Sequence, residues 1–101
     1  MRLGSVDMPM HEIKDFCRRW KVQELALFGS ALGENFGPQS DIDVLVTFSP
    51  EATPSLFDLG TMQQELEGMF GRHVDLVEKA GLRNPFRRKS ILTSMKVIYE
   101  S

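Results

Sequence analysis

Residues Leu27–Phe48 read LFGSALGENFGPQSDIDVLVTF, and the prediction of the fold starts from this stretch. An apolar run leads into the pair Gly29-Ser30, ten residues follow, and a second apolar run then carries Asp41 and Asp43. This pattern predicts a strand, a tight turn into a short helix, a loop and a second strand. Residues two apart in a strand point to the same face, so the two aspartates should project together while the alternating apolar residues face the core.

The two aspartates and the turn before them predict a metal site that faces a phosphate-binding site. Two adjacent carboxylates repel each other, and a divalent cation removes the conflict. Mg²⁺ prefers oxygen ligands and commonly combines one or two carboxylates with substrate phosphates. Gly29 allows a close approach of the backbone to a ligand, Ser30 offers a hydroxyl, and the start of a helix binds anions. Alone, Asp-x-Asp is more often a solvated strand edge and Gly-Ser an ordinary capped turn; together they favour the functional interpretation.

A third carboxylate comes from a later strand, expected at His73–Glu78. Alternation places Asp75 on the face opposite Val74 and Leu76, together with His73, for which a solvated or supporting role is favoured over metal ligation. Two Mg²⁺ ions about 3.5–4 Å apart can hold the attacking and leaving oxygens of a phosphoryl displacement. With the aspartates at 41 and 43 as shared ligands, Asp75 would complete the part of the site that activates the nucleophile.

The rest of the chain alternates helices with strands, which predicts an α/β fold with a small mixed sheet and helices packed against it. Helices are expected at about 9–20, 56–70 and 85–94, and strands at 22–28, 41–48, 73–78 and 96–100. Trp20 is expected to anchor the first helix to the sheet. Gly71 is expected to end the second helix, and Asn84-Pro85 is typical of a helix start. Residues 1–101 are expected to form one domain, with residues 1–8 as a loose leader.

Composition limits the classes of function that the chain can have. An apolar fraction of 42% and a charged fraction of 26% are ordinary for a soluble globular protein. The net charge of −2 makes direct nucleic-acid binding unlikely. No apolar run approaches the ~20 residues that span a bilayer, and the N-terminus lacks the apolar core of an export signal. The single Cys17 excludes an internal disulfide, fits a cytoplasmic protein, and is expected to be buried rather than nucleophilic.

The paired motif, LFGS followed by ten residues and DIDVLV, resembles the signature of the DNA polymerase β-type nucleotidyltransferase superfamily. Asp75 in HVDLVE fits the further aspartate of that superfamily. The small size makes the chain most similar to the minimal nucleotidyltransferases, the MNT or MntA-like antitoxins that are paired with HEPN toxins. The resemblance covers about residues 9–100. It implies a polymerase β-like core with Asp41, Asp43 and Asp75 as catalytic and metal-binding residues.

The same resemblance implies a reaction and a partner. Gly29 and Ser30 would bind the nucleotide, ATP would be the donor, and two Mg²⁺ ions would be the cofactors. AMP would be transferred to a tyrosine hydroxyl of a HEPN RNase toxin, with which the chain would form a hetero-oligomer. Only about 25 residues follow the third acid, too few for a separate substrate-binding domain, so the acceptor should be shaped by another chain.

One departure from the family pattern leaves alternatives open. Many relatives carry an arginine soon after the Gly-Ser pair, whereas this chain has Ala31-Leu32-Gly33. Three roles are open for a basic cluster: to replace that cation, to contact a partner, or to form a solvated helix face. The cluster consists of Arg83, Arg87, Arg88 and Lys89. The alternatives to the enzyme are an antitoxin that neutralises its toxin by binding alone and a small-molecule nucleotidyltransferase that needs a second chain.

Overall fold

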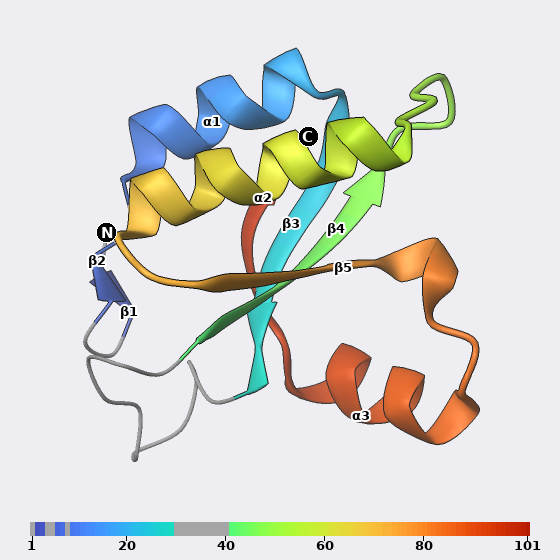
Figure 1. Cartoon of the computed structure of the whole chain (residues 1–101). Coiled ribbons are helices and arrows are strands. Elements are labelled where there is room, and N and C mark those ends of the chain that lie inside the picture. Colours follow the sequence, from blue (N-terminus) through green and yellow to red (C-terminus); the bar gives the residue numbers. More distant parts are fainter. Residues whose placement is uncertain (1, 4–5, 8, 30–40) are drawn as a thin grey trace.

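The computed structural model describes residues 2–3, 6–7, 9–29 and 41–101 (Figure 1). The short strands β1 (Arg2–Leu3) and β2 (Val6–Asp7) pair with each other in antiparallel fashion, within the segment expected to be a loose leader. The short helix and the loop predicted between Ser30 and Ser40 lie outside the described residues. The remaining elements are α1 (Met10–Arg19), β3 (Val22–Phe28), β4 (Ile42–Phe48), α2 (Leu56–Phe70), β5 (Val74–Glu78), the 3-10 turn η2 (Lys79–Gly81), α3 (Pro85–Ser94) and β6 (Lys96–Glu100).

Four of the strands form one mixed sheet in the order β5-β4-β3-β6. The central strand β3 is antiparallel to β4 and to β6, whereas β4 and β5 run parallel. A parallel pair requires a crossover connection, and α2 supplies it between β4 and β5. The mixed sheet with helices packed against it confirms the predicted α/β fold, and the predicted bounds of the strands and helices agree within one or two residues.

The helices cover both faces of the sheet (Figure 1). On one face α1 and α2 lie side by side, and their fully buried residues, such as Phe16 and Met62, pack on the even-numbered residues of β4. On the other face α3 and the segment before it contribute Ile91 and Leu82, which pack on Leu45 and its neighbours in β3. The expectation that β4 is apolar on one side only was therefore incomplete, because Leu45 has its own core beneath α3.

Each helix end that the sequence indicated has a physical cause in the structure. Ser55 and Asp58 form a capping box at the start of α2, and Gly71 ends that helix in the left-handed conformation with a φ of 67°. The side chain of Asn84 accepts hydrogen bonds from two backbone N–H groups at the start of α3, and Pro85 follows it. The predictions for Gly71 and for Asn84-Pro85 are confirmed.

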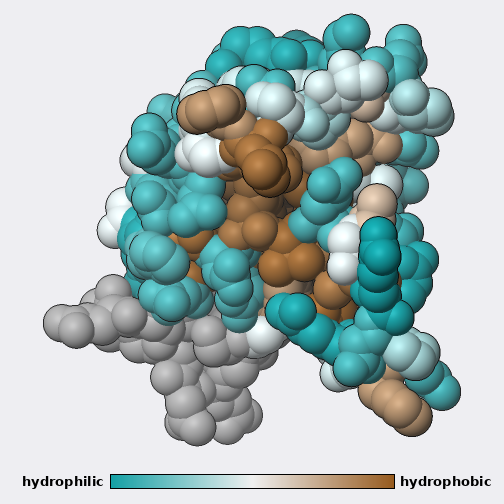
Figure 2. Space-filling view, turned by 45° about the vertical axis from the view of Figure 1, so that its right-hand side comes forward, coloured by the Kyte–Doolittle hydropathy of each residue, from teal (hydrophilic) through white to brown (hydrophobic). Residues whose placement is uncertain are grey.

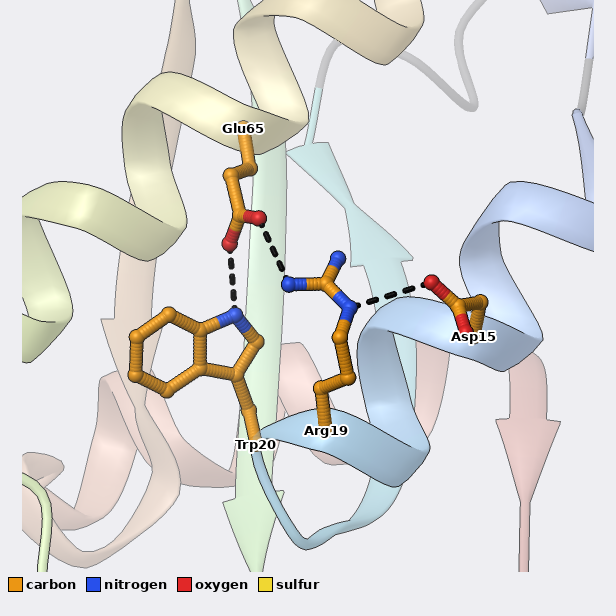
Figure 3. Close-up of polar contacts among 4 residues, drawn as sticks. All are labelled: Asp15, Arg19, Trp20 and Glu65. Atoms are coloured by element: carbon orange, nitrogen blue, oxygen red, sulfur yellow. Dashed lines mark hydrogen bonds and ion pairs between the residues drawn. The ribbon is translucent and has the colours of Figure 1, made fainter.

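A polar cluster joins α1 to α2 on the outer side of the helical layer (Figure 3). Trp20 packs against the core and donates its indole N–H to Glu65 Oε2 at 2.6 Å. Arg19 donates to Glu65 Oε1 at 2.8 Å and to Asp15 Oδ2 at 3.0 Å. The hydrogen bond to Glu65, with that to Asp15, holds the pKa of the Arg19 guanidinium above its usual range. Trp20 therefore anchors α1 to α2 as well as to the core.

Replacing Glu65 with alanine is expected to lower the free energy of unfolding by about 1–3 kcal/mol. The change removes the acceptor of the half-buried Trp20 indole and one of the two carboxylates that bind Arg19. Urea unfolding of the two proteins would measure the loss. Gln64→Ala, at an exposed position next to Glu65, is the control and should change stability by less than about 0.5 kcal/mol. Equal effects of the two substitutions would contradict a bridging role for Glu65.

Two further expectations concern apolar residues. Apolar residues spaced by three or four along 56–70 predict a buried stripe that starts at Leu56, but Leu56 is 86% exposed, while Met62 and Leu66 are fully buried. The fully buried residues of α2 begin only at its second turn, and in the first turn Leu59 is partly buried against the core. Cys17 is fully buried in α1, as predicted, and burial raises the pKa of its thiol to about 12, so the thiol stays protonated at neutral pH and is a poor nucleophile. Over the described part of the chain, no helix is long and apolar enough to cross a membrane.

Candidate active site

The strand register brings two of the three predicted acids together. Asp43 on β4 is directly paired with Asp75 on β5, and both strands run in the same direction. Neighbouring strands are about 4.8 Å apart, and paired residues point to the same face, so the two carboxylates project side by side. Asp43 is half-buried and Asp75 is exposed. Both lie near the amino-terminal ends of their strands, so the pair is accessible at one end of the sheet.

Gly29 approaches this acid pair from the other neighbour of β4. Phe28, the last residue of β3, is paired with Asp43, and Gly29 follows it with a φ of 71°. A Cβ atom on Gly29 would overlap the Oδ2 atom of Asp43. The group that approaches the Gly29 backbone closely is therefore the carboxylate of this chain, and the approach of a ligand to Gly29 stays a prediction. Ser30, the other predicted nucleotide-binding residue, lies outside the described residues.

Asp41 is exposed and lies one residue before the start of β4, whereas the expectation placed it inside that strand. Its Oδ1 atom lies 3.4 Å from Nδ1 of His73. The backbone carbonyl of His73 accepts the N–H of Ile42 at 2.9 Å, which fixes the start of β4 against the start of β5. His73 is thus a neighbour of the acids, which agrees with the supporting role predicted for it.

Glu67 is a residue near the site that the sequence did not indicate. Its Oε2 atom accepts the backbone N–H of Val74 at 3.0 Å and lies 3.7 Å from Nε2 of His73. Through these contacts the last turns of α2 hold Val74, the first residue of β5, one position before Asp75. The only signal for Glu67 in the sequence is its place beside Leu66 in the apolar stripe of the helix, and that signal is shared by many solvated residues.

The positions of the acids determine what kind of metal site they could form. Across residues 9–29 and 41–101, no group of three or more His, Cys, Asp or Glu side chains is arranged so that it could hold a metal ion. Mg²⁺, however, keeps several waters and needs only one or two carboxylates plus substrate phosphates. Asp43 and Asp75, adjacent and beside the glycine turn, provide those carboxylates. The donor set therefore fits Mg²⁺ that is shared with a phosphate ligand, rather than a complete protein cage.

One member of the predicted basic cluster, Arg88, lies away from the acid pair. Arg88 is half-buried and lines a cavity that Thr47 and Lys79 also line, at the carboxyl ends of β4 and β5. Thr47 is four positions after Asp43, a distance of about 13 Å along β4. Arg88 is therefore not a replacement for the arginine that follows Gly-Ser in relatives. The other three cations of the cluster are exposed.

A small mixed sheet that carries aspartates on two neighbouring strands, beside a glycine turn, defines the class of nucleotidyltransferases. Comparison with known proteins agrees. The family described as Nucleotidyltransferase domain matches residues 11–98, and the chain belongs to this family.

Two relatives illustrate the similarity within the family. A Methanocaldococcus jannaschii protein, whose name describes a protein adenylyltransferase, is 34% identical over 90 residues, which cover 81% of this chain and 90% of the relative. The protein adenylyltransferase MntA of Thermococcus cleftensis is 37% identical over 71 residues, which cover 70% of each chain. The resemblance to minimal nucleotidyltransferases is thereby confirmed.

Solved structures support the same fold. A toxin–antitoxin structure with AMP-PNP superposes with a TM-score of 0.74 at 23% identity, covering 93% of this chain and 75% of that chain. A complex of tri-AMPylated Shewanella oneidensis HEPN toxin with MNT antitoxin gives a TM-score of 0.61 at 25% identity, covering 91% and 70% of the two chains. At 23% identity the first likeness shows the fold alone.

Proposed function

We propose that this chain is an antitoxin that transfers AMP from ATP to a tyrosine hydroxyl of a partner HEPN RNase toxin, in a Mg²⁺-dependent reaction. The observation that carries the proposal is the register that places Asp43 beside Asp75 next to Gly29. Relatives named protein adenylyltransferase, and a similar antitoxin in complex with a tri-AMPylated HEPN toxin, support this choice of donor and acceptor.

The residues of the site would divide the work of one phosphoryl displacement. Gly29 and Ser30 would position the triphosphate, and Asp41, Asp43 and Asp75 would hold two Mg²⁺ ions. Bound Mg²⁺ neutralises the charge of the phosphates during the transfer. The tyrosine oxygen forms a bond to the α-phosphorus, the bond to the bridging oxygen of pyrophosphate breaks, and Asp75 accepts the proton of the hydroxyl. His73 and Glu67 would position the acids, since the carbonyl of His73 holds the first residue of β4 and the carboxylate of Glu67 holds the first residue of β5.

The proposed acceptor comes from another chain. The described acids lie at the end of a sheet in a domain of 101 residues, which we propose acts as a single unit. A protein acceptor that docks at this end would complete the site and exclude water from it. The chain would therefore work as a hetero-oligomer with its toxin, and we place this reaction in the cytoplasm, where ATP and the RNA substrates of the toxin are found.

A second function is favoured by one feature of the sequence. Ala31-Leu32-Gly33 replaces the arginine that many relatives carry after Gly-Ser, so a cation for the triphosphate is missing there. A chain that binds ATP weakly could still neutralise its toxin by forming a complex. The retained pair of Asp43 and Asp75 argues against this alternative, because two adjacent carboxylates without a catalytic use are only a cost to stability.

Mass spectrometry of the toxin distinguishes the two functions. A HEPN toxin from the same genome is produced with and without this chain, purified and weighed as the intact protein. The enzyme predicts a mass gain in whole AMP units, mapped to a tyrosine by peptide fragmentation. An unmodified toxin that co-purifies in a tight complex would overturn the enzymatic proposal and support the binding antitoxin.

A further inference from the structure

The cavity that is lined by Arg88, Thr47 and Lys79 lies at the end of the sheet opposite the acids. Its volume is about 410 Å³, within the range of sites for small molecules. It exists because β5 stops pairing with β4 at Glu78, opposite Val46, whereas β4 continues to Phe48. The chain turns away at η2 and leaves space beside the last residues of β4. Ile42 donates its backbone N–H toward β5, so by strand alternation the N–H of Phe48 is directed to the same side, into this space.

Two half-buried cations line this cavity without an anionic partner. The guanidinium of Arg88 has one long hydrogen bond, from Nη1 to the carbonyl of Lys79 at 3.5 Å. Neither Arg88 nor Lys79 forms an ion pair with any described residue. Glu78 also lines the wall but lies beyond ion-pair distance of both, which leaves one net positive charge. A guanidinium has five donors, so most of the hydrogen-bonding capacity of Arg88 is unused by protein groups.

The rest of the wall combines apolar surface with one unsatisfied hydroxyl. Phe48 and Ala52 contribute apolar surface. Figure 2, in which the right-hand side of Figure 1 has come forward, shows a group of apolar side chains surrounded by hydrophilic residues on the side of the molecule that faces the viewer. The Oγ1 atom of Thr47 is buried and has no hydrogen-bond partner among the described residues, a state that costs free energy and that a rearranged, ligand-bound wall would relieve.

We propose that this cavity binds a small anionic molecule, a carboxylate or a phosphate carried on a small apolar body. The anion would lie between Arg88 and Lys79, near the backbone N–H of Phe48, and the apolar body would lie against Phe48 and Ala52. The site is separate from the catalytic acids, since the two lie at opposite ends of β4. It does not depend on the proposed adenylyl transfer.

The proposal is tested by titrating the whole ¹⁵N-labelled chain with phenyl phosphate and with benzoate, without Mg²⁺. We expect saturable shifts of the backbone amide signals of Phe48, Ala52 and Ala80, with a Kd on the order of 1 mM for a ligand of this size. The probe with the lower Kd identifies the preferred anion. Phenol, which has the ring without the charge, should bind at least about tenfold more weakly, because it loses the charge-assisted hydrogen bonds.

Substitutions separate this site from general surface charge. Arg88→Gln and Lys79→Gln should each raise the Kd about tenfold, and because the two residues lie on different elements, a packing defect in one would not affect the other. Arg87→Gln, an exposed neighbour on α3 outside the wall, is the matched control and should leave the Kd unchanged. The proposal is overturned if neither probe shifts these amides, if phenol binds equally well, or if the Kd is the same in all three variants.

Discussion

Asp43→Asn is expected to abolish AMP transfer while the chain stays folded. Asp43 is paired with Asp75 across the parallel strands and touches the backbone of Gly29, so it is central to the proposed site. Asparagine keeps the shape of the side chain but removes the charge that would hold Mg²⁺ and orient the triphosphate. Metal-based charge stabilisation contributes several kcal/mol to such a transfer, and its loss corresponds to a rate at least about 1,000-fold lower.

The fold should tolerate this change because the like-charge repulsion between Asp43 and Asp75 is relieved. Transfer of label from α-³²P-ATP to purified toxin measures activity, and thermal unfolding measures stability. Asp15→Asn is the matched control, since it makes the same chemical change at an exposed ion pair on α1 and should retain full transfer. Undiminished transfer by the Asp43 variant would remove the acid pair from the mechanism and leave antitoxin binding as the function of the chain.

Local patterns in the sequence were sufficient to predict most of the fold. The helix ends at Gly71 and Asn84 follow from backbone conformation and capping, both of which depend on neighbouring residues only. The shared face of Asp43 and Asp75 follows from strand alternation once both strands are assigned. These features are predictable because a few adjacent residues determine each of them.

Features that depend on tertiary packing were less accessible. The direct pairing of Asp43 with Asp75 requires the register of two strands that are separated by a whole helix, and no local pattern contains it. The ladder with β5 begins at Ile42, so β4 starts one residue later than expected and Asp41 directly precedes it. Alternation alone places His73 on the face of Asp75, whereas the place of Glu67 near the site depends on the packing of α2 against the start of β5.

The difference between local pattern and tertiary packing also explains where the burial of apolar residues departs from the prediction. Periodicity identifies which side of a helix is apolar but not how far along the helix the core extends, so Leu56 was expected to be buried and is 86% exposed. By alternation Leu45 lies on the same face of β4 as Asp43, yet it is buried because α3 covers that part of the sheet. A strand can therefore be buried on both faces when a helix that is distant in the sequence covers its second face.

Gly29→Ala is expected to reduce AMP transfer about 100-fold, because displacement of a catalytic group by about 1 Å has an effect of this size. The new Cβ would overlap the Oδ2 atom of Asp43. That atom belongs to a side chain, so the carboxylate can rotate away and the fold can survive, but the pair with Asp75 is then disturbed. The φ of 71° adds backbone strain, and we expect a loss of about 1–3 kcal/mol in the free energy of unfolding.

Gly71→Ala separates the strain from the contact. Gly71 has nearly the same φ, 67°, but nothing lies within 4 Å of a Cβ built there, and it lies at the end of α2 rather than in the site. This variant should lose stability through backbone strain alone and keep its transfer rate per folded molecule. The rates of AMP transfer of the two variants are compared at a temperature where both are folded. A lower rate for Gly29→Ala than for Gly71→Ala would then measure how much the close contact contributes to the position of Asp43. Equal rates in the two variants would mean that Gly29 serves only to turn the chain, and that the position of Asp43 does not depend on it.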